Sequence, residues 1–293
     1  MSGEVSCQSG VRTDKSLKPV VKWAGGKRQI LAEIVKHIPR DLTTYYEPFL
    51  GGGAVLFELQ PERAVVNDLN RELINLYQVI KNQVDELIED LRKHKNEKGY
   101  FYRLRALDRD RGLYVDLTPV QKASRVIYLN KTCYNGLFRV NKAGEFNTPF
   151  GRYKNPKIVN EVGLRAVSDY LNRASVSITC QDFEQAVKGA ESGSFVYFDP
   201  PYDPVSQTAD FTAYAEGGFS REEQERLKRT CDRLNEKGIR FLLSNSATDF
   251  IKELYQGYRI EIIQAKRSVN SVAARRGGID EVLLMNFEPG KGS

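Results

Sequence analysis

Histidine and cysteine are scarce in this chain of 293 residues. Its two histidines, His37 and His94, lie in a helical pattern and in a charged run, so we expect structural or surface roles rather than acid–base chemistry. The cysteines stand far apart, without the paired spacing of zinc ligands, at Cys7, Cys133, Cys180 and Cys231. We therefore predict no metal site, no disulfide framework and a reducing, cytoplasmic compartment.

Long apolar runs are also missing. No stretch approaches the roughly 20 residues of a membrane span, and the hydrophobic content of 41% is ordinary for a globular protein. Residues 1–16 are polar and small, without the apolar core of a signal peptide. We interpret them as a disordered tail and expect no membrane association.

Basic residues are abundant but unevenly distributed. Residues 92–173 contain 18 Lys and Arg against 7 Asp and Glu, whereas the whole chain carries a net charge of +6. This asymmetry is typical of a protein that binds a polyanion, although a solvated basic face would give the same count. Residues 133–156 interleave aromatic and basic side chains, so we predict a hairpin or long loop suited to stack on bases and bind phosphates.

Three consecutive glycines, residues 51–53, follow an early strand pattern. A short helix and a second strand come next, and that strand ends at Asp68. This is the layout of an α/β nucleotide site, with an acid that accepts hydrogen bonds from ribose hydroxyls. The G-x-G-x-x-G fingerprint is absent, so adenosine without a pyrophosphate fits better than a dinucleotide. A second glycine pair, in residues 22–27, precedes a helical pattern and is either a ligand contact at a helix N-terminus or a plain turn.

The most informative stretch follows the apolar run at residues 195–198, which we interpret as a buried strand. Proline cannot donate to a sheet, so the chain must leave it at once. A carboxylate, a carbonyl and an aromatic ring are thereby presented at a strand's carboxyl end, where open α/β sheets bind ligands. These residues are Asp199, Pro200, Pro201 and Tyr202.

The complete pattern predicts an α/β fold. About seven strands with helices between them indicate a single, mostly parallel sheet. The basic segment is inserted between the second and third strands. We predict a catalytic domain made of residues 17–84 and 174–293, and a recognition insertion with a hairpin at residues 85–173.

These stretches, in this order, resemble a known family. KWAGGK (residues 22–27), EPFLGGG (47–53) and DPPY (199–202) are similar to motifs of the Dam-type adenine-N6 DNA methyltransferases, the alpha group of the D12 class. In the insertion, YNGL (134–137) and GEFNTPFGRYK (144–154) are similar to the DNA-reading part of members that act on GATC.

The resemblance extends over residues 18–287 and implies a Rossmann-like, S-adenosylmethionine-dependent methyltransferase sheet with an inserted, mostly helical DNA-recognition domain. S-adenosylmethionine would be the methyl donor and S-adenosylhomocysteine the product. Asp182 would meet the adenine amino group of the cofactor, and Asp68 would meet its polar groups. Phe49 and Phe183 would lie against the cofactor, although core packing is an alternative role for these two rings. The implied cofactor-binding residues are Trp23, Lys27, Phe49, Gly51, Gly53, Asp68, Asp182 and Phe183.

The expected reaction places a methyl group on N6 of adenine. That nitrogen is a poor nucleophile because its lone pair is delocalised into the ring. Hydrogen bonds to the Asp199 carboxylate and the Pro200 carbonyl would favour a tetrahedral nitrogen, and Tyr202 would stack on the flipped base. The catalytic residues are accordingly Asp199, Pro200, Pro201 and Tyr202.

The resemblance also implies how double-stranded DNA containing GATC is read. Lys22 and Arg139 would contact guanines, Asn135 and Leu137 other bases, and Tyr134 the position vacated by the flipped adenine. The complete set of implied DNA-binding residues is Lys22, Tyr134, Asn135, Leu137, Arg139, Pro149, Tyr153 and Lys154. We expect a monomer that acts on nucleoid DNA, either alone or as the partner of a restriction enzyme.

Alternatives exist at two levels. Arg152 is as basic as Arg139 and is the alternative phosphate contact.

An amino-methyltransferase for protein or RNA could share the fold, but relatives that methylate glutamine typically have Asn where Asp199 stands. A nicotinamide dehydrogenase would need phosphate-binding glycines, and a non-catalytic DNA-binding protein has little need for both a cofactor pocket and DPPY. Finally, we expect the loops at residues 203–219 and 266–278 to be mobile without DNA.

Overall fold

The computed structural model describes residues 17–27, 29–141, 143–205, 219–265 and 279–289. The predicted tail, residues 1–16, lies outside the described residues, as do residues 206–218 and 266–278 of the two predicted mobile loops. No helix in the described ranges is long and apolar enough to cross a membrane.

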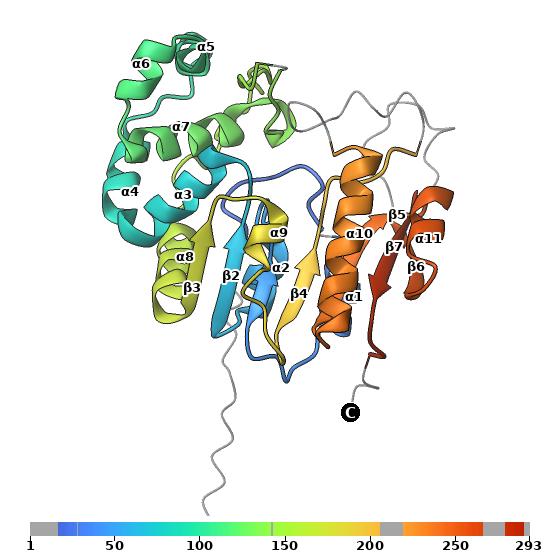
Figure 1. The fold of residues 1–293 in the computed structure, drawn as a ribbon. Coiled ribbons are helices and arrows are strands. Elements are labelled where there is room, and N and C mark those ends of the chain that lie inside the picture. The colour runs from blue at the N-terminus through green and yellow to red at the C-terminus, as the bar shows by residue number, and fades with distance from the viewer. Residues whose placement is uncertain (1–16, 28, 142, 206–218, 266–278, 290–293) are drawn as a thin grey trace, which may run out of the picture.

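Seven strands of the described chain form one sheet in the order β3-β2-β1-β4-β5-β7-β6 (Figure 1). Their bounds are β1 Tyr45–Glu47, β2 Arg63–Asn67, β3 Ser175–Thr179, β4 Phe195–Phe198, β5 Arg240–Ser246, β6 Arg259–Ala265 and β7 Ile279–Met285. The first five strands are parallel, and β7 is antiparallel to both of its neighbours. The predicted α/β fold with one mostly parallel sheet is confirmed.

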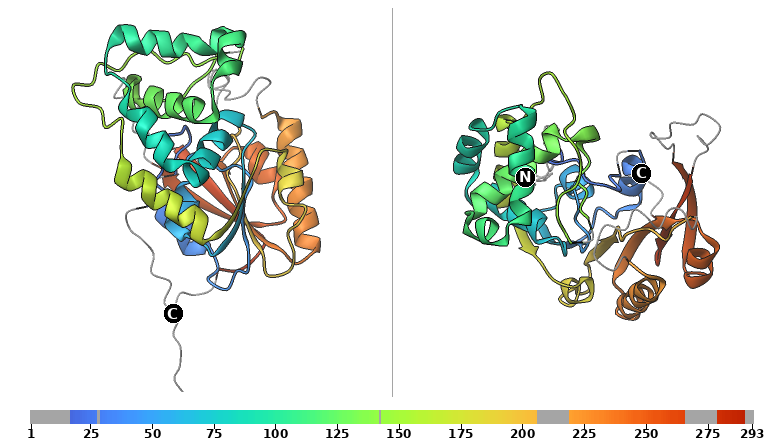
Figure 2. Two further views of the ribbon diagram at one scale, coloured as in Figure 1. Left: turned by 90° about the vertical axis from the view of Figure 1, so that its left-hand side faces the viewer. Right: turned by 90° about the horizontal axis from the view of Figure 1, so that it is seen from above.

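Helices cover both faces of the sheet, because side chains of a buried strand alternate between the faces. The helices concerned are α1 Leu31–His37, α2 Ala54–Leu59, α3 Arg71–Asn82, α9 Phe183–Ala186, α10 Arg221–Glu236 and α11 Asp249–Leu254. In β4, Phe195 and Tyr197 pack into one hydrophobic cluster with α1, α2 and α3, whereas Val196 and Phe198 pack into a second with α9, α10 and α11. Seen from above, the two helix groups lie on opposite sides of the sheet (Figure 2).

The segment between β2 and β3 is mostly helical. After α3 it contains α4 Val84–Arg92, α5 Lys98–Ala106, α6 Arg111–Asp116, α7 Pro119–Thr132 and α8 Glu161–Arg173. One continuous helix over residues 72–91, which the apolar spacing predicts, is wrong. The backbone of Gln83 leaves the helical region (φ −142°) and separates α3 from α4, which then packs against α7 and α8.

Helix α7 agrees with the helix predicted for residues 119–131. Thr118 begins it with a capping box, in which its Oγ1 accepts from Gln121 N (3.2 Å) and the Gln121 side chain accepts from Thr118 N (2.9 Å). Helix α8 packs against the strand β3 as well as against α4. The boundaries of the insertion at residues 85 and 173 therefore stay a prediction.

The polar stretch after α7 folds back on itself. Antiparallel bridges join Cys133 to Phe150 and Val140 to Phe146, and we call residues 133–150 the hairpin. The Asp108 carboxylate accepts from Phe146 N (2.7 Å) and pairs with Arg125 of α7 (2.8 Å). Because both charged groups are largely buried, removing either one would leave an uncompensated charge. This ion pair therefore fixes the hairpin to α7.

Candidate active site

The carboxyl ends of β1, β2 and β4 meet at one edge of the sheet. Strand β1 pairs in parallel with β2 on one side and with β4 on the other. The chain reaches β4 only after β3 at the far side, so the strand order reverses between β1 and β4. Open α/β sheets bind ligands at such a switch point. The glycine loop 51–53, Asp68 and Asp199 all follow these strand ends.

The glycine loop is held against Asp68. Gly51 N donates to Asp68 Oδ2 (2.9 Å), and Asn70 N donates to Oδ1 (2.9 Å). Burial raises the pKa of Asp68, while these hydrogen bonds lower it. Gly51 and Gly53 have φ values of +49° and +69°, and a Cβ on Gly53 would lie 2.8 Å from the Phe57 ring. The loop therefore requires glycine at these positions, because a side chain there would be strained and would meet neighbouring rings of this chain.

Asp182 and Phe183 lie beside this loop at the start of α9. Asp182 Oδ1 accepts from Glu184 N (2.9 Å), and Oδ2 pairs with the guanidinium of Arg226 from α10 (2.5 Å). That guanidinium lies 4.4 Å from the centre of the Phe183 ring, which in turn is 5.5 Å from the ring of Phe49. The structure therefore brings the predicted pair Phe49 and Phe183 together, and the Arg226 guanidinium covers one face of the Phe183 ring.

Asp199 is held by side chains from two other parts of the chain. Its Oδ1 lies 2.7 Å from Lys27 Nζ and accepts from Ser244 Oγ (3.0 Å), and its side chain is one-fifth exposed at 20%. Burial raises the pKa of Asp199, and the nearby Lys27 charge lowers it. The Lys27 ammonium also donates to Gly25 O (2.7 Å) and lies 4.4 Å from the centre of the Tyr202 ring. The first and last motifs are thus in direct contact.

Two further acids contribute to this edge. Tyr202 OH donates to Glu281 Oε2 of β7 (2.8 Å), and burial raises the pKa of Tyr202, so the phenol keeps its proton. At the end of β1, the Glu47 carboxyl is buried and accepts from Tyr45 OH (3.0 Å). Burial raises the pKa of Glu47, and the charge of Asp199 raises it further. A protonated Glu47 would limit the negative charge gathered here.

Trp23 lies between the glycine loop and the hairpin. Its indole stacks on Phe138 with ring centres 4.6 Å apart. A Cβ added to Gly51 would lie 3.2 Å from Trp23 Cδ1, so the ring covers the loop closely. The indole therefore touches both the predicted cofactor loop and the predicted DNA-reading segment.

The Asn130 side chain of α7 joins Lys22 of the first motif to the turn at residues 134–137. Lys22 N donates to Asn130 Oδ1 (2.9 Å), and Asn130 Nδ2 donates to the carbonyls of Lys22 (2.8 Å) and Gly136 (3.0 Å). Lys22 Nζ donates to the carbonyl of Asn135 (2.8 Å), a residue with a φ of +58°. The first motif is thus fastened to the YNGL turn.

The side chains predicted to read DNA lie on the hairpin, in residues 153–154 that follow it, and at Lys22, which contacts the YNGL turn. Tyr134 is 59% exposed and Tyr153 is 41% exposed, so both rings are accessible for stacking. Arg139 is exposed as well, and its Nε donates to Asn147 Oδ1 (3.1 Å). Of the remaining members of the set, the exposed ones are Lys22, Asn135, Pro149 and Lys154, and the half-buried one is Leu137.

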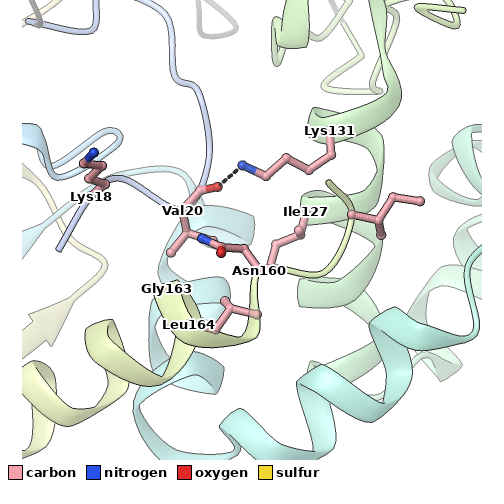
Figure 3. Close-up of a pocket in the computed structure, with 8 residues that line it drawn as sticks. Lys18, Val20, Ile127, Lys131, Asn160, Gly163 and Leu164 are labelled. Carbon is pink, nitrogen blue, oxygen red and sulfur yellow. Dashed lines mark hydrogen bonds between the residues drawn. The ribbon is translucent and has the colours of Figure 1, made fainter. Parts of the chain in front are cut away.

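A small cavity of about 60 Å³ lies elsewhere, between the N-terminal segment, α7 and α8 (Figure 3). Lys131 Nζ crosses it to the carbonyl of Val20 (2.6 Å). No predicted site residue lines this cavity. Across the described ranges, no group of three or more His, Cys, Asp and Glu side chains could hold a metal ion.

Several contacts of this site are not predicted from the sequence. Ser244 and Glu281 lie at or next to predicted strands, and a polar residue at the shared sheet edge is a signal that could have identified them. Arg226 and Asn130 give no such signal, because their partners lie 44 and 108 residues away.

Comparisons with known proteins agree with this geometry. Residues 23–269 match a family model described as D12 class N6 adenine-specific DNA methyltransferase. The chain is 45% identical to the type II methyltransferase M1.LlaDCHI of Lactococcus lactis subsp. cremoris, over 93% of this chain and 96% of that protein. It is 42% identical to the type II methyltransferase M.MjaIII of Methanocaldococcus jannaschii, over 92% and 99%. It is 34% identical to the DNA adenine methylase of Escherichia coli K12, over 94% and 97%.

Proposed function

Because the chain belongs to the D12 class N6 adenine-specific DNA methyltransferases, we propose that it transfers a methyl group from S-adenosylmethionine to N6 of an adenine flipped out of duplex DNA, within GATC. The observation that supports this most strongly is the contact between the first and last motifs. Lys27 Nζ lies 2.7 Å from Asp199 and 4.4 Å from the Tyr202 ring centre, beside the glycine loop at the switch point.

The residues at the sheet edge fit S-adenosylmethionine. Asp68 and Asp182 are acceptors suited to hydroxyl and amino groups, and the aromatic rings can pack against an adenine. The residues proposed to hold it are Trp23, Lys27, Phe49, Gly51, Gly53, Asp68, Asp182 and Phe183. When bound, the cofactor supplies a methyl group on a positively charged sulfur.

Asp199 and Pro200 orient the attacking nitrogen. In the described part of the chain, the side chains that hydrogen-bond the Asp199 carboxylate do so at Oδ1, through Lys27 and Ser244. Oδ2 is then the oxygen that accepts from the adenine amino group, together with the Pro200 carbonyl. Both bonds favour a tetrahedral nitrogen whose lone pair points at the methyl carbon. The N–C bond would form as the S–C bond of the cofactor breaks, and the proton that the nitrogen gives up would pass through the Asp199 carboxylate to solvent.

Tyr202 binds the flipped base from its face. Its ring is half-buried, and the hydrogen bond to Glu281 fixes its orientation. Flipping is needed because an adenine amino group inside a duplex cannot reach a buried catalytic carboxylate. Most of the rate enhancement then comes from positioning the two reactants.

The hairpin supplies sequence recognition in this proposal. Its exposed aromatic and basic groups suit stacking and major-groove hydrogen bonds. Preference for GATC is supported by the similarity of residues 134–137 and 144–154 to GATC-acting members. The residues assigned to DNA are Lys22, Tyr134, Asn135, Leu137, Arg139, Pro149, Tyr153 and Lys154.

The test is transfer of a labelled methyl group from S-adenosylmethionine to a duplex with one GATC. We expect label in N6-methyladenine of that duplex, and none in a matched duplex whose GATC adenines are already methylated. Transfer to protein or RNA but not to the unmethylated duplex would contradict the proposal.

A further inference from the structure

Two amide side chains lie directly behind the DPPY segment. Gln224 comes from α10 and Asn245 from β5, and both are fully buried at 0% exposure. Neither belongs to the motifs that indicate the reaction. Buried polar side chains are costly unless their hydrogen bonds are satisfied, so their contacts show what they do there.

The contacts form a chain that reaches the backbone on both sides of Tyr202. Gln224 Nε2 donates to the carbonyl of Pro201 (2.9 Å), and Asn245 Nδ2 donates to Gln224 Oε1 (3.1 Å). Asn245 Oδ1 then accepts from Asp203 N (3.0 Å) and from Ser246 N (2.8 Å). The Tyr202 backbone is therefore held from both neighbours by side chains of two different elements.

The segment needs such support because of its composition. Pro200 and Pro201 have no N–H, so their backbone cannot donate to the sheet or to a turn. Once the chain leaves β4, the donors and acceptors that fix it must come from elsewhere. Hydrogen bonds in a fully buried site are strong and directional, because water does not compete for them.

We propose that Gln224 and Asn245 are positioning residues for methyl transfer, which set the backbone that carries Asp199, the Pro200 carbonyl and Tyr202. This inference rests on the proposed function and concerns the same site. Neither side chain touches the substrate. They act by keeping the carboxylate, the carbonyl and the ring at the separations that the flipped adenine requires, where displacement by about 1 Å can cost about 100-fold in rate.

The experiment compares single-turnover methylation rates, with S-adenosylmethionine and a GATC duplex both saturating. Gln224→Met removes both hydrogen bonds at similar size. Asn245→Asp keeps the acceptor for Asp203 N and Ser246 N but loses the donor to Gln224. We expect rates lower by about 10- to 100-fold for both variants, because Asn245→Asp also places a carboxylate in a fully buried site. Dissociation constants for cofactor and DNA should stay within about threefold of the wild type.

The matched control is Asn286→Ala, which follows β7 and contacts the end of β5 that is remote from the site. Asn286 Oδ1 accepts from Phe241 N (2.9 Å), and its Nδ2 donates to Asn235 Oδ1 (3.0 Å) and to the Ile239 carbonyl (2.9 Å). This variant should lose stability but keep the single-turnover rate. If Gln224→Met does not fold, Asn245→Asp decides the question.

Three results would overturn the inference: variant rates within threefold of the wild type, a loss of cofactor affinity equal to the loss of rate, or an equal loss of rate in the control. Failure of the proposed function is distinguishable, because then the wild type itself would transfer no methyl group to the duplex.

Discussion

Two opposing effects act on the pKa of Asp199, and they decide whether it is a carboxylate that can accept a hydrogen bond from an amino group. Burial favours the protonated acid, and the Lys27 ammonium favours the carboxylate. Only the carboxylate offers all of its lone pairs to the adenine amino group. Lys27 is therefore as important to the charge state of the site as the acid itself.

Replacing Asp199 by Ala should abolish methyl transfer and leave cofactor binding measurable. The reason is that Asp68, Phe49 and Phe183, the residues proposed to hold the cofactor, lie outside DPPY, whereas the amino group of the substrate loses its charged acceptor. Single-turnover methylation and equilibrium titration with S-adenosylmethionine measure the two effects separately. Unchanged turnover would remove Asp199 from the mechanism.

Replacing Lys27 by Met should move the acid limb of the methylation pH profile to higher pH. Without the ammonium, burial alone acts on the carboxyl, so the pKa of Asp199 rises further and activity is lost at a higher pH as the solution is acidified. Lys27→Arg keeps the charge and is the control. The interpretation fails if Met and Arg at this position give the same acid limb.

At the scale of elements, Asn130 fastens the segment before α1 to α7 and to the YNGL turn. Asn130→Ala leaves the Lys22 N–H and two carbonyls without their partner. A buried unsatisfied group costs about 1–3 kcal/mol, so we expect a comparable loss in free energy of unfolding. Because Lys22 and the turn lose their alignment, the ratio of kcat/KM for GATC over a site with one changed guanine should also fall.

A matched control for this change is Asn172→Ala in α8. Its Nδ2 likewise donates to backbone carbonyls, those of Lys81 (2.6 Å) and Ser168 (2.9 Å), but it lies away from the hairpin. That variant should lose stability without losing discrimination. Equal discrimination in the Asn130 variant and the wild type would show that the fastening is only structural.

The strands could be predicted from the sequence, and several helices could not. β4 is a continuous apolar run because it is buried on both faces, a pattern that is local and therefore readable. α5 has a single buried side chain, Phe101, and so carries no apolar stripe. Arg125 of α7 donates to the carbonyls of Leu104 (2.7 Å) and Arg105 (3.0 Å) at its C-terminal end, which stabilises the helix through a contact that local sequence does not contain.

The same distinction applies to the site. The motif residues are readable because each follows a strand or precedes a helix, and their gathering follows from parallel strands ending at one edge. Gln224 and Arg226 carry no comparable signal, since their side chains act on backbone or carboxylates of other elements, whereas Asn245 shares the strand-end signal of Ser244. What a strand end presents is predictable, and what holds it in place depends on packing.

At the scale of the whole molecule, the insertion stands beyond the carboxyl edge of the sheet, so DNA held by the hairpin would approach the switch point (Figure 1). His94 lies inside the insertion, with Nδ1 2.8 Å from Tyr100 OH and Nε2 2.8 Å from Ser124 Oγ. The role is structural, as the sequence predicts. Burial lowers the pKa of His94 from its ordinary value of 6.5.

Stability should therefore depend on pH through His94. The unfolded chain binds the proton more readily than the folded one, so the stabilising contribution is complete above pH 6.5 and is lost as the pH falls below that value. The raised pKa values of Glu47, Asp68 and Asp199 act in the opposite direction. Since those acids are present in both proteins, the difference in unfolding free energy between wild type and His94→Gln isolates the histidine.

Chemical denaturation measures this difference. As the pH falls from 7.5 to 5.5, the wild type should lose more unfolding free energy than His94→Gln. A difference independent of pH would mean that His94 keeps the same proton affinity in the folded and unfolded chain.

In the proposed function, this molecule selects one adenine by sequence and methylates it through Asp199. The most direct measurement is to map every methylated adenine in genomic DNA after exposure to the purified protein and S-adenosylmethionine, with Asp199→Ala as the control. We expect N6-methyladenine at GATC on both strands with the wild type, and none above background with the variant. Methylation at unrelated sequences would contradict the recognition assigned to the hairpin, and methylation that persists in the variant would contradict the chemistry assigned to DPPY.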